Sequence, residues 1–440
     1  MYHDDGAGYS LKARKDTLDE WLAWQLSLHH KSIELGLERV AAVATGLEID
    51  SIASNVITVA GTNGKGSTVA CYENWLHKAG FSVASYTSPH LLRYNERIKL
   101  NTQCVSDDEI CEAFGAVDMA RGEVTLTYFE FGTLAALWLI NRHQPDYAIL
   151  EVGLGGRLDA VNIIDANMVH LTSIGIDHQS WLGNTREQIG YEKAGVLRAG
   201  ILVVCNDPQL PNSVLDELSR LECHYLQYQR DFDLQETHQQ GVYEWQGNEF
   251  KCRVRPPLPG VYQLQNIAGV IAGLSLLFPL QHLGEGVVGE RFSGTMLPGR
   301  FQCLDTEFVF DTYIDVGHNR DAAKALAKNL VQVKRASGKI IVLLGMLEDK
   351  ENNYFVAELD DIVDEWWLLS LDCDRGLDAD ILAERIGSRF SIEMKFSNSE
   401  LALGHALSSL SNQDIIMVTG SFATVEIFLQ AISKVHPIQI

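Results

Sequence analysis

A glycine-rich segment between a predicted strand and a predicted helix is the most chemically informative part of the sequence. Residues 59–68 read VAGTNGKGST. Backbone N–H groups of such a turn, with the positive end of the following helix, form a cradle for phosphate. Lys65 would add a positive charge at the β- and γ-phosphates, and Ser67 or Thr68 a hydroxyl group. The spacing departs from the usual P-loop at Gly66, so the segment predicts a nucleotide site, with a ligand-free turn as the alternative.

A second candidate follows another predicted strand, where residues 151–162 read EVGLGGRLDAVN. The carboxyl ends of parallel strands are where open α/β sheets bind ligands. Glu151 could hold Mg²⁺ near the phosphates, because Mg²⁺ takes few carboxylates together with substrate oxygens. The alternative without a ligand is a flexible glycine loop capped by the charges of Arg157 and Asp159.

Two further side chains are weaker candidates when taken alone. His178, in the segment TSIGIDHQSWLG, could bind a metal through a neutral imidazole, although a lone histidine is more often structural. Lys193, in the segment EKAG, follows a helical run and would by default be a solvated helix residue. We expect Glu151 and His178 to lie on adjacent strand ends and to converge on one metal ion.

The last third of the chain carries two short motifs of the same kind. PGR occupies 298–300, and DVGHN occupies 315–319 after a predicted strand. Together they could supply an arginine, a carboxylate and a histidine that face the first part of the chain. The alternative for the second motif is an ordinary turn in which Asn319 caps the next helix.

The elements that must position these side chains alternate between strand and helix. Such alternation predicts a mainly parallel sheet with helices on both faces. We predict a P-loop type N-terminal α/β domain over 1–292, a linker over 293–300 and a smaller, Rossmann-like α/β domain over 301–440. Expected elements include a helix over 18–36, with Leu26 and Leu28 in the core, and the following strands and helices: strands at 55–60, 81–86, 147–152, 168–173, 201–205, 308–311, 340–344, 366–371 and 415–418, and helices at 67–79, 106–121, 129–143, 186–193, 321–333, 378–386 and 400–410.

Composition restricts the class of protein. Of 440 residues, 58 are acidic and 35 basic, which gives a net charge of −23. This disfavours broad binding to nucleic acid or to anionic membranes. The eight cysteines form no CxxC pair, so neither a disulfide framework nor a thiolate zinc site is indicated. The start lacks the apolar region of a secretory signal, and no apolar run suits a membrane span. We therefore expect a cytoplasmic protein.

The order of the motifs resembles one family. GTNGKGS, SPHL, NERI, TYFEFGT, EVGLGGRLDA, TSIGIDH, EKAG, PGR and DVGHN are similar to the motifs of the bacterial dihydrofolate synthase/folylpolyglutamate synthases, members of the Mur ligase superfamily. The resemblance runs from about residue 21 to 435. It implies a ligase that uses ATP to phosphorylate a substrate carboxylate, after which the amine of L-glutamate displaces phosphate. Dihydropteroate and reduced folates are the implied acceptors, Mg²⁺ (two ions) the cofactor, and a monomer the implied state.

The resemblance also implies roles for particular residues. Lys65, His178 and Lys193 would be catalytic, and Lys193 would be carried as a carbamate, N6-carboxylysine. His318 and Ser421 would line the cleft near ATP or glutamate. The implied ATP contacts are Thr62, Asn63, Gly64, Lys65, Gly66, Ser67, Asn266, Arg300 and Asp315. The implied dihydropteroate contacts are Thr127, Tyr128, Phe129, Glu130, Leu158, Asp159 and Ala160, and the implied Mg²⁺ ligands are Ser88, Glu151 and His178.

Two positions depart from the family pattern. Arg320 stands where a proline is expected, and Val161 where a threonine is expected, which puts the shapes of those loops in doubt. Two alternatives stay open. One is a folylpolyglutamate synthase without dihydropteroate activity, which TYFEFGT and RLDA disfavour. The other is a P-loop nucleotide-binding protein without ligase activity.

Overall fold

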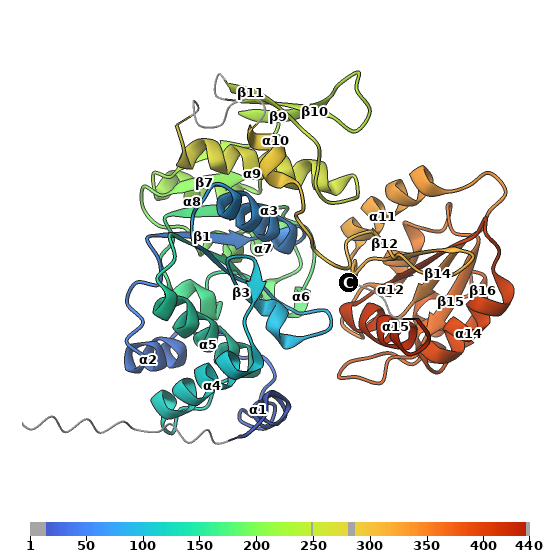
Figure 1. Ribbon diagram of the computed structural model, residues 1–440, viewed down its shortest axis with the longest axis horizontal. Helices are drawn as coiled ribbons and strands as arrows, with labels where there is room; N and C mark the ends of the chain where they lie inside the picture. The colour runs from blue at the N-terminus through green and yellow to red at the C-terminus, as the bar shows by residue number, and fades with distance from the viewer. Residues whose placement is uncertain (1–14, 248–249, 280–286, 437–440) are drawn as a thin grey trace, which may run out of the picture.

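Two α/β units lie side by side in the protein, connected by the chain near residue 300 (Figure 1). The computed structural model describes residues 15–247, 250–279 and 287–436. The first residues, to which the expectation of no secretory signal refers, lie outside this range. No helix among the described residues has the length and apolar character needed to cross a membrane.

The N-terminal unit is built on a sheet of eight strands in the order β4-β3-β2-β5-β1-β6-β7-β8. The six strands from β2 to β8 in this order are parallel, and β3 and β4 add an antiparallel edge. The predicted mainly parallel sheet is confirmed. The strands are β1 (Asn55–Ala60), β2 (Val83–Tyr86), β3 (Ile98–Leu100), β4 (Gln103–Cys104), β5 (Tyr147–Glu151), β6 (Met168–Leu171), β7 (Leu202–Cys205) and β8 (His224–Gln227).

Helices cover both faces of this sheet. One face packs against α3 (Lys65–Lys78) and α9 (Tyr262–Leu277), which share a core with side chains of β1 and β5. The other face packs against α1 (Leu18–Gln25), α2 (Glu38–Gly46), α4 (Asp107–Arg121) and α5 (Tyr128–His143). Farther along the sheet lie α6 (Gln179–Leu182), α7 (Arg186–Ala194) and α8 (Asn212–Arg220). Burial of apolar side chains on both faces explains why the strands read as continuous apolar runs.

A separate three-stranded antiparallel sheet was not anticipated from the sequence. It consists of β9 (Phe232–Glu236), β10 (Tyr243–Gly247) and β11 (Phe250–Val254). The sheet packs on α9, and the indole of Trp245 donates a hydrogen bond to the carbonyl of Ala268. Its strands are short and rich in polar residues, which weakens any strand signal.

The C-terminal unit contains a six-stranded sheet in the order β12-β13-β17-β14-β15-β16. Only β12 is antiparallel to its neighbour, so this second α/β unit is also as predicted. The strands are β12 (Gln302–Cys303), β13 (Asp311–Ile314), β14 (Ile340–Leu344), β15 (Glu365–Leu369), β16 (Ile392–Phe396) and β17 (Ile415–Thr419). The helix α10 (Val287–Phe292) packs against α3 and β11 of the N-terminal unit. The helices of the C-terminal unit are α11 (Arg320–Val333), α12 (Asn352–Ala357), α13 (Ala379–Ile386), α14 (Ser399–Ser409) and α15 (Phe422–Val435).

Two of the expected elements were placed wrongly. The helix expected over 18–36 ends at Gln25, and Leu26 is 71% exposed rather than in the core. Beyond it, His29 contacts Thr125 and Glu34, and these tertiary contacts replace a continued helix. The strand expected at 308–311 begins instead at Asp311, because only from there does the chain pair with β17.

Candidate active site between the two domains

The predicted motifs gather at one edge of the N-terminal sheet. Four neighbouring strands, in the order β2-β5-β1-β6, lead into Ser88, Glu151, the turn 61–64 and the loop to His178. This order corrects one prediction, because β1 lies between the strands that precede Glu151 and His178. The phosphate turn, which follows β1, therefore lies between Glu151 and His178, and these two residues do not follow neighbouring strands. The α6 region after β6 lies on the side that faces the C-terminal unit (Figure 1).

The turn before α3 has the backbone of a phosphate cradle. Gly64 adopts φ 88°, a left-handed conformation that glycine accepts without strain. A Cβ placed there would lie 2.4 Å from Oδ1 of Asn266, so α9 presses directly on the turn. The hydroxyl of Ser67, at the start of α3, accepts a hydrogen bond from Nε2 of Gln263, a residue of α9, at 3.0 Å. The ammonium of Lys65 donates to the carbonyls of Gly61 and Thr62 and so stays folded over the turn.

Lys193 is not a solvated helix residue. It is buried, and its Nζ donates to the carbonyl of Gly61 at 2.8 Å. Burial, together with the nearby charge of Lys65, lowers the pKa of Lys193 to about 7. A large share of this side chain is therefore an uncharged, nucleophilic amine near neutral pH.

Glu151 is a buried carboxylate whose charge has no direct ion-pair partner within 4 Å among the described residues. Its Oε2 accepts a hydrogen bond from the backbone N–H of Ser88 at 3.2 Å. Burial raises the pKa of Glu151, while the more distant charges of Lys65 and Arg300 oppose that rise. A buried, unpaired carboxylate is costly. The donor chemistry at this position thus fits a divalent cation.

His178 provides an uncharged ring nitrogen at neutral pH. Burial lowers its pKa to about 4, and the neighbouring Asp177 only partly offsets this effect. Within the described ranges, no three His, Cys, Asp or Glu residues cluster as a complete metal site. An ion held by Ser88, Glu151 and His178 would need oxygens from phosphate and water, which is the usual coordination of Mg²⁺.

The C-terminal unit contributes residues to the same turn. A Cβ at Gly66 would lie 3.7 Å from both a guanidinium nitrogen of Arg300 and Oε2 of Glu151. Asp315 is buried and accepts hydrogen bonds from the backbone of Phe301 and Gly317 and from the Tyr262 hydroxyl. Arg300 therefore lies beside the phosphate turn, while Asp315 fixes the backbone that carries it.

The segments expected to bind dihydropteroate lie next to one another. A Cβ at Gly153 would meet the ring of Phe129 at 2.5 Å, so this ring packs on the loop that follows β5. Asp159 is buried, accepts hydrogen bonds from the backbone of Leu154 and Val161, and has its pKa raised to about 6 by burial. Val161, one of the two departures from the family pattern, is itself buried in the core.

Three other members of the expected substrate set have structural partners. Thr127 and Glu130 form a capping box at the start of α5, and Glu130 also pairs with Arg39 at 2.8 Å. The guanidinium of Arg97 lies 5.5 Å from the centre of the Tyr128 ring. Leu158 is partly exposed beside the loop, and Ala160 is buried.

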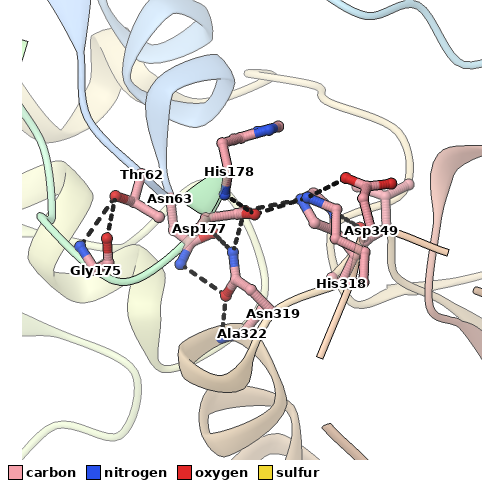
Figure 2. Close-up of polar contacts among 12 residues, drawn as sticks. Thr62, Asn63, Gly175, Asp177, His178, His318, Asn319, Ala322 and Asp349 are labelled. Carbon is pink, nitrogen blue, oxygen red and sulfur yellow. Dashed lines mark hydrogen bonds and ion pairs between the residues drawn. The ribbon is translucent and has the colours of Figure 1, made fainter. Parts of the chain in front are cut away.

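A polar cluster joins the two domains (Figure 2). Its members Asn63, His318 and Asn319 were singled out in the sequence, whereas Asp177 and Lys350 were not. The cluster joins Asn63 of the phosphate turn, Asp177 of the loop after β6, and His318, Asn319 and Lys350 of the C-terminal unit. Asp177 stands directly before His178, and charged residues beside candidate ligands are the signal that could have drawn attention to it. Lys350 carries no such local signal. Ser421 caps α15 and is buried there, whereas His318 faces Asp177.

Comparison with known proteins defines the class. Residues 59–274 match the Mur ligase middle domain, and residues 299–422 match the Mur ligase glutamate ligase domain. The chain therefore belongs to the Mur ligases, whose middle and glutamate ligase domains it contains.

Its relatives narrow the class further. The dihydrofolate synthase/folylpolyglutamate synthase of Haemophilus influenzae is 39% identical over 428 residues, covering 93% of this chain and 96% of that protein. The Escherichia coli enzyme of the same name is 37% identical, covering 94% and 95%. The chain belongs to the dihydrofolate synthase/folylpolyglutamate synthase family. The predicted family and the predicted fold are confirmed.

Solved structures agree with this placement. E. coli FolC in complex with DHPP and ADP matches with a TM-score of 0.87 at 36% identity, covering 95% of this chain and 98% of that one. A bifunctional folylpolyglutamate synthase/dihydrofolate synthase with Mn, AMPPNP and L-glutamate bound matches with a TM-score of 0.85 at 38% identity, covering 96% and 98%.

Proposed function

We propose that this enzyme joins L-glutamate to dihydropteroate, forming dihydrofolate, and to reduced folates, forming folylpolyglutamates. A carboxylate oxygen of the acceptor attacks the γ-phosphorus of ATP, and ADP leaves. The amine nitrogen of glutamate then attacks the acyl carbon, and inorganic phosphate leaves with the original carboxylate oxygen. The observation that carries the proposal is the convergence of Lys65, Glu151, His178 and Lys193 around one phosphate turn.

The residues around the turn suit a reaction between two anions. Bringing a carboxylate to ATP costs electrostatic repulsion, which positive charge in a partly dry site must offset. Lys65 of the N-terminal domain and Arg300 at the end of the linker supply that charge. Ser88, Glu151 and His178 would hold the Mg²⁺, which supplies charge neutralisation at the phosphates when bound. Phe129, Gly153 and Asp159 would hold the pteridine-bearing acceptor beside them.

Lys193 is proposed to act as a carbamate. The neutral amine adds to CO₂, forming an N–C bond and releasing one proton, and the product is a carboxylate on a long arm. Its depressed pKa and burial support this assignment, because the uncharged amine is the reactive form. The resulting anion would sit against the phosphate turn, where it could help to bind a second Mg²⁺.

The remaining proposals concern organisation. We propose that residues 293–300 link an N-terminal domain, 1–292, to a C-terminal domain, 301–440, and that the enzyme acts as a cytoplasmic monomer. The two separate sheets support the division, and the acidic net charge of −23 fits a protein that does not engage nucleic acid or membranes.

The activity is tested by ADP release. We expect release with dihydropteroate and with tetrahydrofolate only when L-glutamate is also present. Release with tetrahydrofolate alone among the two acceptors would support a folylpolyglutamate synthase without dihydropteroate activity. ADP release that depends neither on an acceptor nor on glutamate would contradict the ligase proposal.

A further inference from the structure

Asp177 connects the two domains through a single buried carboxylate. Its Oδ1 accepts hydrogen bonds from the backbone N–H of His178 at 2.8 Å and from Nζ of Lys350 at 2.7 Å. Its Oδ2 accepts from Nδ2 of Asn319 at 3.0 Å and lies 3.3 Å from Nε2 of His318 (Figure 2). One of these four partners belongs to the loop after β6, and the other three belong to the C-terminal domain.

The backbone of His178 needs such support. Its φ is 53°, the left-handed region that a residue with a side chain rarely occupies. This conformation sets the direction in which the imidazole leaves the chain. The bond from its N–H to Asp177 holds the strained residue, so the position of Asp177 determines the position of the ring.

Asp177 in turn has little freedom once the domains are docked. The side chains of Asp177 and Lys350 are only 8% and 6% exposed, so their ion pair is almost fully desolvated. Such a pair is a poor source of net stability, because removing two charges from water offsets their attraction. It does fix geometry, since breaking it would leave a buried charge alone.

Asn319 extends the connection to the nucleotide site. Its side-chain amide donates to Oδ1 of Asn63 at 2.9 Å as well as to Asp177, and Nδ2 of Asn63 donates back at 3.1 Å. The phosphate turn and the loop that carries His178 are therefore held against the same side chain at the start of α11. The two loops also bond each other directly, since the hydroxyl of Thr62 accepts from the backbone N–H of Gly175 at 2.9 Å. Asn319 adds a contact to both loops from the other domain.

We propose that Asp177 is a positioning residue through which the docked C-terminal domain completes the metal site. Lys350 and Asn319 fix the Asp177 carboxylate, which holds His178 in the conformation that binds the metal ion. The affinity for metal thus depends on a lysine of the other domain that is not itself a ligand. This inference rests on the proposed role of His178.

The test is Mn²⁺ binding to the full-length enzyme with AMPPNP and without acceptor or glutamate. The dissociation constant is measured from the electron paramagnetic resonance signal of free Mn²⁺. We expect Asp177→Asn and Lys350→Met each to weaken binding by about tenfold, as is typical when support of a metal ligand is lost. Leaving out glutamate means that any role of Lys350 in binding that substrate does not affect the result.

A purely electrostatic effect of these residues on the metal ion predicts a different result, so the experiment distinguishes it from a positioning role. Removing the negative charge of Asp177 would weaken cation binding, but removing the positive charge of Lys350 would tighten it. The double variant restores the net charge and would then bind Mn²⁺ as the wild type does. Positioning predicts weakening in all three variants, with the double variant no weaker than the weaker-binding single variant. Tighter binding by Lys350→Met, or wild-type binding by the double variant, would overturn the proposal.

Two controls separate the possible failures. Glu351→Ala removes an exposed contact across the same interface, from Nε2 of Gln179 at 3.0 Å, and should leave Mn²⁺ binding unchanged. An equal loss in this control would mean that any interface change weakens the site, and would overturn the specific role of Asp177. His178→Ala should weaken binding more than the other variants. Unchanged binding there would refute the proposed metal site itself, whereas a loss confined to His178→Ala would refute only the positioning role.

Discussion

Lys193 and Lys65 donate hydrogen bonds to the same backbone carbonyl, that of Gly61, at 2.8 and 3.1 Å. Two ammonium groups at one acceptor repel each other, and Lys193 is also buried. Burial and this neighbour together lower the pKa of Lys193 to about 7. The phosphate turn therefore holds two lysine side chains, of which the buried Lys193 readily becomes neutral. The proposed chemistry requires a neutral amine at Lys193, which forms the carbamate, and a positive charge at Lys65, which offsets the charge of the phosphates.

The depressed pKa makes Lys193 a pH-dependent cost to folding. Unfolded lysine titrates near its model value of 10.5, so below that pH the unfolded chain binds the proton more tightly. The cost grows as pH falls from about 10 to 7 and then stays constant, at about 1.4 kcal/mol per unit of pKa shift. Lys193→Met should therefore gain stability relative to wild type at pH 6.5, and less at pH 9.5. Urea unfolding of CO₂-depleted, metal-free protein measures this, and a pH-independent difference would contradict it.

Lys193→Ala should abolish synthesis while the chain still folds. A side chain that ends at Cβ cannot form the carbamate, and a short carboxylic acid could then occupy the vacated space and supply the missing anion. We expect partial rescue by acetate or propionate, and none by the corresponding amides, which serve as uncharged controls. Full activity of the alanine variant would leave Lys193 without a catalytic role.

Lys65→Ala should lose most of its turnover, on the order of a hundredfold or more, because a positive charge in a partly desolvated site is costly to remove. Among the residues that the structure describes, the ammonium of Lys65 bonds only to carbonyls of its own turn, so the fold should persist. Circular dichroism checks the fold and a coupled assay for ADP checks turnover. Lys78, at the other end of the same helix, offers a matched control in Lys78→Ala, which should retain wild-type turnover.

Local patterns in the sequence placed the candidate motifs at strand ends, but they did not give the order of those strands in the sheet. Motifs at strand ends converge because parallel strands align their carboxyl ends, so Glu151 and His178 could be brought together from local patterns. The order of the strands could not be predicted in this way, because β1 pairs with β5 and β6 through contacts between residues that are far apart in the sequence. Contacts that the local pattern does not reveal also explain why the helix expected over 18–36 ends at Gln25.

The interface between the domains was the least predictable part. Lys350 meets Asp177 only because two separately folded units dock, and 173 positions separate them in the chain. Nothing in the pattern around either residue specifies that pairing. Burial of Lys193 was likewise unforeseen from the residues alone, because a lysine near a helix end is ordinarily solvated.

Gly153→Ala should impair the acceptor site selectively. The new methyl group would meet the Phe129 ring at 2.5 Å, and the ring must move. We expect the KM for dihydropteroate to rise about tenfold, while the KM for ATP stays near the wild-type value because the phosphate turn is untouched. Gly115→Ala, on the solvent side of α4 with no atom near the added methyl group, is the matched control. If the KM for dihydropteroate and the KM for ATP rise equally, Phe129 does not line a pocket that binds the acceptor alone.

Transfer of a labelled oxygen tests the central claim most directly. Dihydropteroate carrying ¹⁸O in its carboxylate is incubated with ATP, Mg²⁺, L-glutamate and the enzyme, and the inorganic phosphate is analysed by mass spectrometry. If the acceptor is activated as an acyl phosphate, each phosphate released carries one ¹⁸O from the carboxylate, and dihydrofolate forms in equal amount. Unlabelled phosphate, or phosphate released without dihydrofolate, would contradict the account.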